Sequence, residues 1–275
     1  MATVGRTREV GRFLRELGCQ THRELEVVVV DQNTDDRLRP ILQPFEPLLT
    51  IKHVRSALGL SRARNAGLKH IAGDVVAFPD DDCWYGPHLL QTLAAQFHRH
   101  AEWDGITGRP VTPGGAEVMG RFDRDPGPVT KNNVWRRVNS NTLFFRRRLI
   151  DRVGDFDETL GVGAGTPWGS SEDVDYPLRA VAARCCLHYD PDCTVFHPDD
   201  PRPASDPARL RRAYSYNVGM GRVLRKHQFP LWFVLYSWLG PLKPMTLALV
   251  RGRQHEARFF GAMSAGRVRG WLGWG

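Results

Sequence analysis

Apolar residues in the first 110 positions follow two spacings, one typical of helices and one typical of buried strands. In residues 8–17 they recur every three or four positions, which predicts a helix. Residues 25–31 instead contain an unbroken β-branched run, which indicates a strand covered on both sides. The predicted elements of this region are helices over 8–17, 60–73 and 88–100 and strands over 25–31, 48–54 and 74–80. Strands separated by such helices predict a parallel sheet with helices on both faces.

The pattern beyond residue 110 is less regular. Residues 110–135 are rich in glycine and proline without a hydrophobic period, so a long loop is expected. Residues 140–160 predict a strand and a short helix, and a glycine-rich loop then leads to an acidic helix start at Glu172. Two short strands are expected over 185–190 and 193–197.

From residue 206 the pattern becomes mostly helical and its chemistry changes. Residues 208–227 are basic and aromatic, and an apolar run of 14 residues over 229–242 is interrupted by Gly240 and Pro241. A membrane span needs about twenty apolar residues, so this run is predicted to be too short to cross a bilayer. We expect a helix that lies in the membrane interface, with Trp and Arg beside its apolar face. A helix packed on the rest of the protein is the alternative.

Composition is that of a globular protein, but the charge is unevenly distributed. The 275 residues are 41% hydrophobic and 25% charged, which suits one large domain with or without an appendage. Residues 202–275 hold 13 of the 38 Lys and Arg residues but only two of the 30 acidic ones. We therefore expect a domain over 1–201 and a separate basic helical region over 202–275.

The cysteines and the first residues both favour the cytosol. The five cysteines are odd in number and lack the spacing of zinc ligands, so reduced thiols are expected. Residues 1–12 contain no apolar segment of the signal-peptide type.

Three consecutive aspartates, Asp80, Asp81 and Asp82, follow the apolar run over 75–78. Two like charges about 4 Å apart repel by roughly 4 kcal/mol at an effective dielectric near 20, so the cluster is costly without a neighbouring cation. A divalent ion such as Mg²⁺ or Mn²⁺ would remove this cost, whereas a solvated turn is the structural alternative. Asp31 also ends a predicted strand. Ligands of parallel sheets bind at the carboxyl ends of the strands, so this convergence favours a functional site.

Three segments, taken in order, resemble the family 2 glycosyltransferases of the GT-A fold. They are VVVVDQNTDD, LSRARNAGLKHIAGDVVAFPDDDCWYGP and GSSEDVDYPLR, and the resemblance covers residues 2 to about 200. It implies an α/β fold with a Rossmann-like mixed sheet and helices on both faces, followed here by a C-terminal helical, membrane-associating appendage. It also implies transfer of a sugar, of the hexosyl type, from a nucleotide diphosphate to an acceptor hydroxyl.

The resemblance implies a donor site built on the aspartate motif. Asp82 matches the direct ligand of a Mn²⁺ or Mg²⁺ ion that bridges the diphosphate, and Asp80 and Asp81 match positions that hold the ribose or metal-bound water. Asp80 and His197 are the further candidate metal ligands. The positions that match nucleotide contacts are Thr3, Asp31 and Arg64.

Plain alternatives exist for several of these residues. Asp31 also suits a turn at a strand end, and a single histidine such as His197 is more often structural. Thr3 departs from the family pattern, because only two residues precede it where the family has a longer apolar strand. The first strand is therefore expected to be either very short or incomplete.

On the acceptor side, the resemblance makes Asp173 the base that removes the acceptor hydroxyl's proton in an inverting transfer, with Glu172 as its neighbour. Ser170 and Asp173 also have the spacing of a capping box, so a structural role at the helix start is the alternative. Trp168 is expected either to stack on the acceptor sugar or to pack as an ordinary tryptophan.

Together these features predict an inverting, metal-dependent transferase of bacterial surface or exopolysaccharide synthesis with a UDP-linked donor. The basic tail would hold it, as a peripheral cytoplasmic protein, at the anionic inner face of the plasma membrane, where a glycan or polyprenyl-diphosphate-linked acceptor is expected. Nucleic acid is not expected as a partner, because the basic residues lie beside an apolar, Trp-rich segment. A nucleotidyltransferase and a non-catalytic nucleotide- or membrane-binding protein of the same fold are the competing hypotheses.

Overall fold

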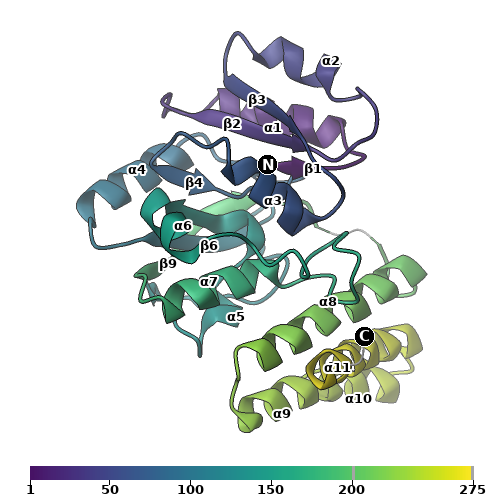
Figure 1. Cartoon of the computed structure of the whole chain (residues 1–275). Helices are drawn as coiled ribbons and strands as arrows, with labels where there is room; N and C mark the ends of the chain where they lie inside the picture. Colours follow the sequence, from purple (N-terminus) through teal and green to yellow (C-terminus); the bar gives the residue numbers. More distant parts are fainter. Residues whose placement is uncertain (200–201, 274–275) are drawn as a thin grey trace. The chain divides into compact units, whose positions relative to one another are not determined.

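The computed structural model describes residues 1–199 and 202–273. Within them the chain forms two compact units, whose elements are drawn in Figure 1. Unit 1 comprises Met1–Leu58, Arg62–Phe156 and Tyr176–Asp199, and unit 2 comprises Gly59–Ser61, Asp157–Asp175 and the described residues after 200. The boundary predicted at residue 201 lies outside the described residues.

Unit 1 contains two sheets. One is parallel with the order β1-β2-β3, and the other is mixed with the order β4-β8-β6-β9-β5, with β7 paired to β9. The strands are β1 (Ala2–Thr3), β2 (Glu26–Asp31), β3 (Thr50–Arg55), β4 (Val75–Ala77), β5 (Trp84–Tyr85), β6 (Gly105–Val111), β7 (Gly127–Pro128), β8 (Leu143–Arg146) and β9 (Leu187–Phe196). The helices before residue 200 are α1 (Arg8–Gly18), α2 (Arg39–Leu42), α3 (Leu60–Leu68), α4 (Leu89–Arg99), α5 (Val134–Arg137), α6 (Arg147–Val153) and α7 (Glu172–Ala182), with the 3-10 turns η1 (Gln43–Phe45) and η2 (Ser140–Thr142).

Helix α1 and strand β2 supply the centre of the core of unit 1. Val10 and Leu14 of α1 and Val29 of β2 are fully buried, and they share one apolar cluster with Leu93 and Phe97 of α4. Full burial of such a side chain stabilises the fold by about 1.5–3 kcal/mol relative to exposure. The core therefore holds β2 rigidly, and the last residue of this strand is the candidate site residue Asp31.

Most predicted elements are present, and the mixed sheet that the resemblance implies is confirmed, but the parallel sheet expected from the periodicity is limited to β1, β2 and β3. β1 and β2 run parallel with Thr3 opposite Asp31, whereas β4 pairs antiparallel with β8 in the second sheet. Hydrophobic periodicity marks buried strands without encoding their direction, which explains the difference. Helix α3 also ends at Leu68 rather than at Gly73, because the N–H of His70 bonds the carbonyl of Gly67 in a tight turn.

The two short strands predicted on either side of residue 191 are one strand, β9. Pro191 lies inside it, and the neighbouring strand β6 shifts register across Gly108. A Cβ at Gly108 would collide with the carbonyl oxygen of Cys193, so only glycine fits this close approach. The region 110–135, expected to be a loop, contains the end of β6, the two-residue strand β7 and the start of α5.

Helices after residue 202 form most of unit 2. They are α8 (Pro207–Lys226), α9 (Leu231–Leu239), α10 (Leu242–Val250) and α11 (Gln254–Leu272). Helices α8 and α11 lie side by side (Figure 1), and glycines bring their backbones into contact. A Cβ on Gly221 would collide with the carbonyl of Arg267, and one on Gly270 would collide with that of Val218.

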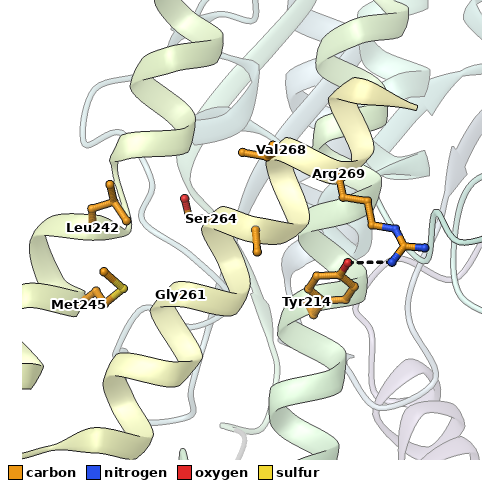
Figure 2. A pocket seen from close by; sticks show the side chains of 8 residues that line it. Tyr214, Leu242, Met245, Gly261, Ser264, Val268 and Arg269 are labelled. Carbon is orange, nitrogen blue, oxygen red and sulfur yellow. Dashed lines mark hydrogen bonds between the residues drawn. The ribbon is translucent and has the colours of Figure 1, made fainter. Parts of the chain in front are cut away.

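A groove of about 620 Å³ lies between α8, α10 and α11 (Figure 2). Leu242 and Met245 of α10 line it on one side, and the small Gly261 of α11 leaves space beside them. On the other side Arg269 Nη1 donates a hydrogen bond of 3.2 Å to Tyr214 Oη. The groove therefore has apolar walls and a cationic edge.

The apolar run after α8 is longer than the sequence pattern predicts. The segment Leu231–Val250 has 20 residues and a mean hydropathy of 1.3, so by length and composition it could cross a membrane. The expectation of a run too short for a span is therefore wrong, because the helix resumes directly after Gly240 and Pro241. Only 22% of the most apolar 18-residue stretch of this segment is buried. We call its exposed large side chains the tail apolar face: Leu231, Trp232, Leu235, Tyr236, Leu239, Leu247, Leu249 and Val250.

Candidate active site

The aspartates after β4 are held by side chains from the beginning of the chain. Arg6 Nη1 lies 2.5 Å from Asp81 Oδ1 and 2.6 Å from Asp82 Oδ2, so one guanidinium bridges both carboxylates. Thr3 Oγ1, at the end of β1, donates a hydrogen bond of 2.6 Å to Asp81 Oδ2. The aspartate cluster therefore has a cationic partner within the chain, and Thr3 lies beside this cluster.

Asp82 also faces His197, with 3.2 Å between Oδ1 and Nε2. Burial alone would raise the pKa of Asp82, but His197 and Arg6 lower it to about 2. Burial would conversely lower the pKa of His197, and the Asp82 carboxylate raises it above its ordinary value. His197 Nδ1 lies 2.6 Å from the carbonyl oxygen of Pro198, which leaves Nε2 to face the carboxylate. The pKa of Asp81 is instead raised, because the effect of burial exceeds the opposite effect of its hydrogen bonds with Thr3 and Arg6.

Asp80 points toward a different pair of residues. Ser140 Oγ, in η2, lies 2.9 Å from both carboxylate oxygens of Asp80. Arg64 Nη2, from α3, lies 3.5 Å from Asp80 Oδ1, and Arg64 is buried. The structure thus places both Arg64 and Ser140 at the aspartate motif.

Asp31 is fully buried at the end of β2 and already has several partners. His53 Nε2 and Arg55 Nη1 each lie 2.9 Å from Asp31 Oδ2. The N–H of Asn33 donates a hydrogen bond of 2.9 Å to Asp31 Oδ1, which is an Asx-type turn. The turn at the strand end is therefore formed, and Asp31 lies opposite Thr3 in the sheet.

The residues expected to bind a metal are only partly assembled. Among the described residues, no three His, Cys, Asp or Glu side chains gather closely enough to hold an ion by themselves. Asp82 and His197 do meet, and His197 Nδ1 is held by a backbone carbonyl, as in most metal-binding histidines. Mg²⁺ is commonly bound by one or two carboxylates together with substrate phosphates, so this pair fits a cation that arrives with its nucleotide.

The Glu172–Asp173 pair begins helix α7 and belongs to unit 2. Glu172 is buried, and Gly161, with φ +100°, leaves room for its carboxylate. Ser170 Oγ, the cap expected from the capping-box spacing, donates a hydrogen bond of 2.7 Å to the carbonyl of Tyr216. The sequence spacing misplaces the cap by one residue, since the helix begins at Glu172.

Trp168 lies in the glycine-rich loop before this helix. The guanidinium carbon of Arg222 lies 4.3 Å above its ring, which is a cation–π contact. Its Nε1 is buried and has no hydrogen-bond partner among the described residues. Trp168 therefore packs within unit 2 and is only partly exposed.

Sequence reasoning missed three residues of these clusters. Arg6 lies in a short turn without any hydrophobic period, and its only sequence signal is a basic residue soon after β1. Ser140 precedes a strand and resembles any polar loop residue. Asp175 is fully buried in the first turn of α7, where an acidic residue suits a helix start equally well.

Comparison with known proteins identifies the family. The model described as "Glycosyl transferase family 2" matches residues 1–154, which is more than half of the chain. The chain belongs to glycosyltransferase family 2. The resemblance seen in the sequence motifs is thereby confirmed.

Curated relatives of this family 2 chain are similar over part of their length. An uncharacterized glycosyltransferase of Nostoc, alr2836, is 28% identical over 54% of this chain and 50% of its own length. Glycosyltransferase AglE of Haloferax volcanii is 28% identical over 70% of this chain and 63% of its own. The chain thus spans about half to two thirds of these two relatives.

Solved structures share the fold along the whole chain. Residues 1–349 of TarS from S. aureus have a TM-score of 0.59 at 19% identity, covering 99% of this chain and 90% of that chain. The mannosyltransferase PcManGT of Pyrobaculum calidifontis, in complex with GDP-Man and Mn²⁺, has a TM-score of 0.64 at 16% identity, covering 100% and 86%. At this identity the similarity concerns the fold, and it confirms the predicted α/β class of the GT-A type.

Proposed function

We propose that the chain transfers a sugar, with inversion, from a UDP-linked donor to a glycan or lipid-linked acceptor in cell-surface polysaccharide synthesis. The observation that carries this proposal is the convergence of Thr3, Arg6 and His197 on Asp81 and Asp82 at the end of β4. Among similar proteins, TuaG is named for teichuronic acid biosynthesis and TarS has a structure with UDP-GlcNAc. These names support a surface glycan and a uridine nucleotide.

The donor side combines fixed carboxylates with cationic side chains. Asp82, with His197 and Asp80, would hold a Mn²⁺ or Mg²⁺ ion, which supplies positive charge to the leaving diphosphate. Arg6 neutralises Asp81 and Asp82, and it would be available to the diphosphate where a bound cation balanced these carboxylates instead. Thr3, Asp31 and Arg64 are the proposed contacts to the nucleotide, and all three belong to unit 1.

Asp173 is the proposed base, with Glu172 beside it. Its carboxylate takes the proton of the acceptor hydroxyl while that oxygen attacks the anomeric carbon opposite the leaving group. The first turn of α7 fixes the backbone of Asp173. Trp168 of the preceding loop is the proposed surface for the acceptor sugar.

The tail is the proposed membrane contact. The tail apolar face lies on α9 and α10, and the groove beside α10 adds further apolar surface. Residues 202–275 carry the excess of Lys and Arg described above, and each basic residue near an anionic surface contributes about 1 kcal/mol of attraction. We infer peripheral binding at the cytoplasmic face of the membrane, where a polyprenyl-diphosphate-linked acceptor would be reached.

A thermal-shift panel tests the donor proposal. The wild type is heated with UDP-, GDP- and dTDP-sugars, each with Mn²⁺ or with a chelator, and one nucleotide is expected to raise the melting temperature only when the metal is present. Asp82→Asn should abolish this shift, whereas the control Glu46→Gln, at an exposed acidic residue of unit 1, should retain it. If no nucleotide shifts the wild type under either condition, the proposal fails and a non-catalytic protein of the same fold is favoured.

A transfer assay with the responding donor tests the chemistry. An α-linked donor should yield a β-linked product, which the anomeric coupling in an NMR spectrum reports. A product with retained configuration contradicts the role given to Asp173, and transfer of the nucleotidyl group with release of sugar 1-phosphate would indicate a nucleotidyltransferase.

A further inference from the structure

One face of helix α8 lies along the segment that carries the proposed base. The contacting positions of α8 recur every three or four residues, as expected for a single helical face. The carbonyl of Tyr216 accepts the hydrogen bond from Ser170, and a Cβ on Gly219 would lie 2.5 Å from the carbonyl oxygen of Ser170. Arg222 covers Trp168. The contact thus runs along three turns of α8.

Lys226, in the last turn of α8, and the following His227 end this contact in an ionic cluster around the buried Asp175. Lys226 Nζ lies 2.8 Å from Asp175 Oδ1 and 2.6 Å from Asp157 Oδ2. His227 Nε2 lies 2.7 Å from the same Asp175 oxygen. The side chain of Asp175 is only 1% exposed, so the loss of either partner weakens the compensation of a buried carboxylate. All these residues belong to unit 2.

The segment between these contacts requires outside support. Ser171 has φ +70°, a left-handed conformation that residues other than glycine seldom adopt. Such a conformation persists only where neighbouring structure holds it. Ser171 lies between Ser170, which is bonded to α8, and the first turn of α7 with Asp173 and Asp175. Helix α8 therefore holds both sides of the strained residue.

We propose that Lys226 and His227 are positioning residues, which fix the first turn of α7 and thereby place the Asp173 carboxylate for proton removal. This inference rests on the proposed function of Asp173. It gives the basic tail a role in the chemistry in addition to membrane binding. Helix α9 begins at Leu231, four residues after His227, so the anchor of the catalytic turn and the start of the tail apolar face are adjacent in the chain.

Kinetics of Lys226→Met and Lys226→Arg test the proposal. Small displacements of a reacting group cost up to about 100-fold in rate, so Lys226→Met is expected to lower kcat by roughly 10- to 100-fold while the donor KM stays within about twofold. Lys226→Arg keeps the charge and should restore most of kcat. Glu256→Gln, which removes an exposed ion pair with Arg253 in the same unit, is the matched control and should behave as wild type.

Amide hydrogen exchange gives a readout that does not depend on turnover. Residues 172–176 should exchange faster in Lys226→Met than in wild type or Glu256→Gln. His227→Gln, which keeps a hydrogen-bond donor, is measured in the same way if Lys226→Met does not fold. The proposal is overturned if Lys226→Met exchanges its amide hydrogens over residues 172–176 as slowly as wild type and keeps the wild-type kcat. It is also overturned if kcat and donor affinity fall together in Lys226→Met and Lys226→Arg restores neither. If the wild type transfers no sugar from any donor, the proposed function fails, whereas the exchange data still decide whether the ionic cluster fixes this turn.

Discussion

Replacement of Asp82 and of Asp81 by asparagine should change stability in opposite directions. In the metal-free protein, Arg6 and His197 lower the pKa of Asp82 from 3.8 to about 2. A lowered pKa means that the folded state favours the ionised carboxylate, so its contribution is present above pH ~4 and is lost as the pH falls toward 2. Burial instead raises the pKa of Asp81, so the ionised form of that residue lowers stability at neutral pH.

The magnitude for Asp82 follows from this shift. At 1.36 kcal/mol per pKa unit, the decrease corresponds to ~2 kcal/mol of unfolding free energy at neutral pH. The side chain of Asp82 is 18% exposed, so solvent screening removes little of this amount. For a chain of this size 1 kcal/mol shifts the melting temperature by about 2–4 °C, so Asp82→Asn should melt about 4–8 °C lower than wild type. Asp81→Asn should melt at or above the wild-type temperature, because the amide oxygen still accepts the bond from Thr3.

Chemical denaturation in the presence of a chelator measures both variants. The loss of unfolding free energy in Asp82→Asn should be present at neutral pH and should shrink as the pH falls from ~4 toward 2. An Asp82→Asn variant that is more stable than wild type in neutral chelator buffer would falsify the reasoning. It would mean that repulsion among the three aspartates exceeds the attraction of Arg6 and His197, so that the site depends on a metal for its stability.

Three further outcomes are expected. Asp173→Asn should lower the transfer rate at least about 100-fold, measured at saturating donor, while the affinity for UDP in a titration stays as in wild type. Leu235→Glu should weaken co-sedimentation with anionic vesicles about tenfold or more, whereas Leu58→Glu, at a similarly exposed apolar position of unit 1, should not. If both variants sediment with the vesicles as wild type does, the tail apolar face is not the membrane contact. Gly108→Ala should lose about 1–3 kcal/mol of unfolding free energy in urea, because its Cβ meets the carbonyl of Cys193, and Gly18→Ala, with open space around it, should lose none.

Local patterns in the sequence were sufficient for the central elements and for several site residues. Helix α1, strand β2 and helix α4 carry their own apolar periodicity, so their positions follow from neighbouring residues alone. Thr3 became a candidate only through the family resemblance, and neither its pairing with Asp31 nor its bond to Asp81 was predicted from the sequence. His197 and Arg64 reach the same place because the family motifs are tied to the fold.

Contacts between distant segments could not be predicted in the same way. Arg6 meets Asp81 across 75 positions, and Lys226 meets Asp175 across more than 50, with no local signal to connect the partners. Helix α7 begins one residue beyond the position predicted from the capping-box spacing, and the Ser170 hydroxyl bonds the carbonyl of Tyr216 in α8, 46 positions away. Strand direction and the continuation of the helix past Pro241 likewise depend on packing that periodicity does not report.

The glycine contacts between α8 and α11 decide how a soluble version of this chain should be made for crystallography. A chain that ended before Gln254 would lack α11, whose backbone packs directly against Gly221. A detergent molecule could not replace this contact, because it cannot approach the helix so closely. The exposed side chains of α9 and α10 have no such neighbour and can be exchanged for Lys, Glu or Gln. Solubility is therefore better sought by surface replacement on these two helices than by deletion of the last one.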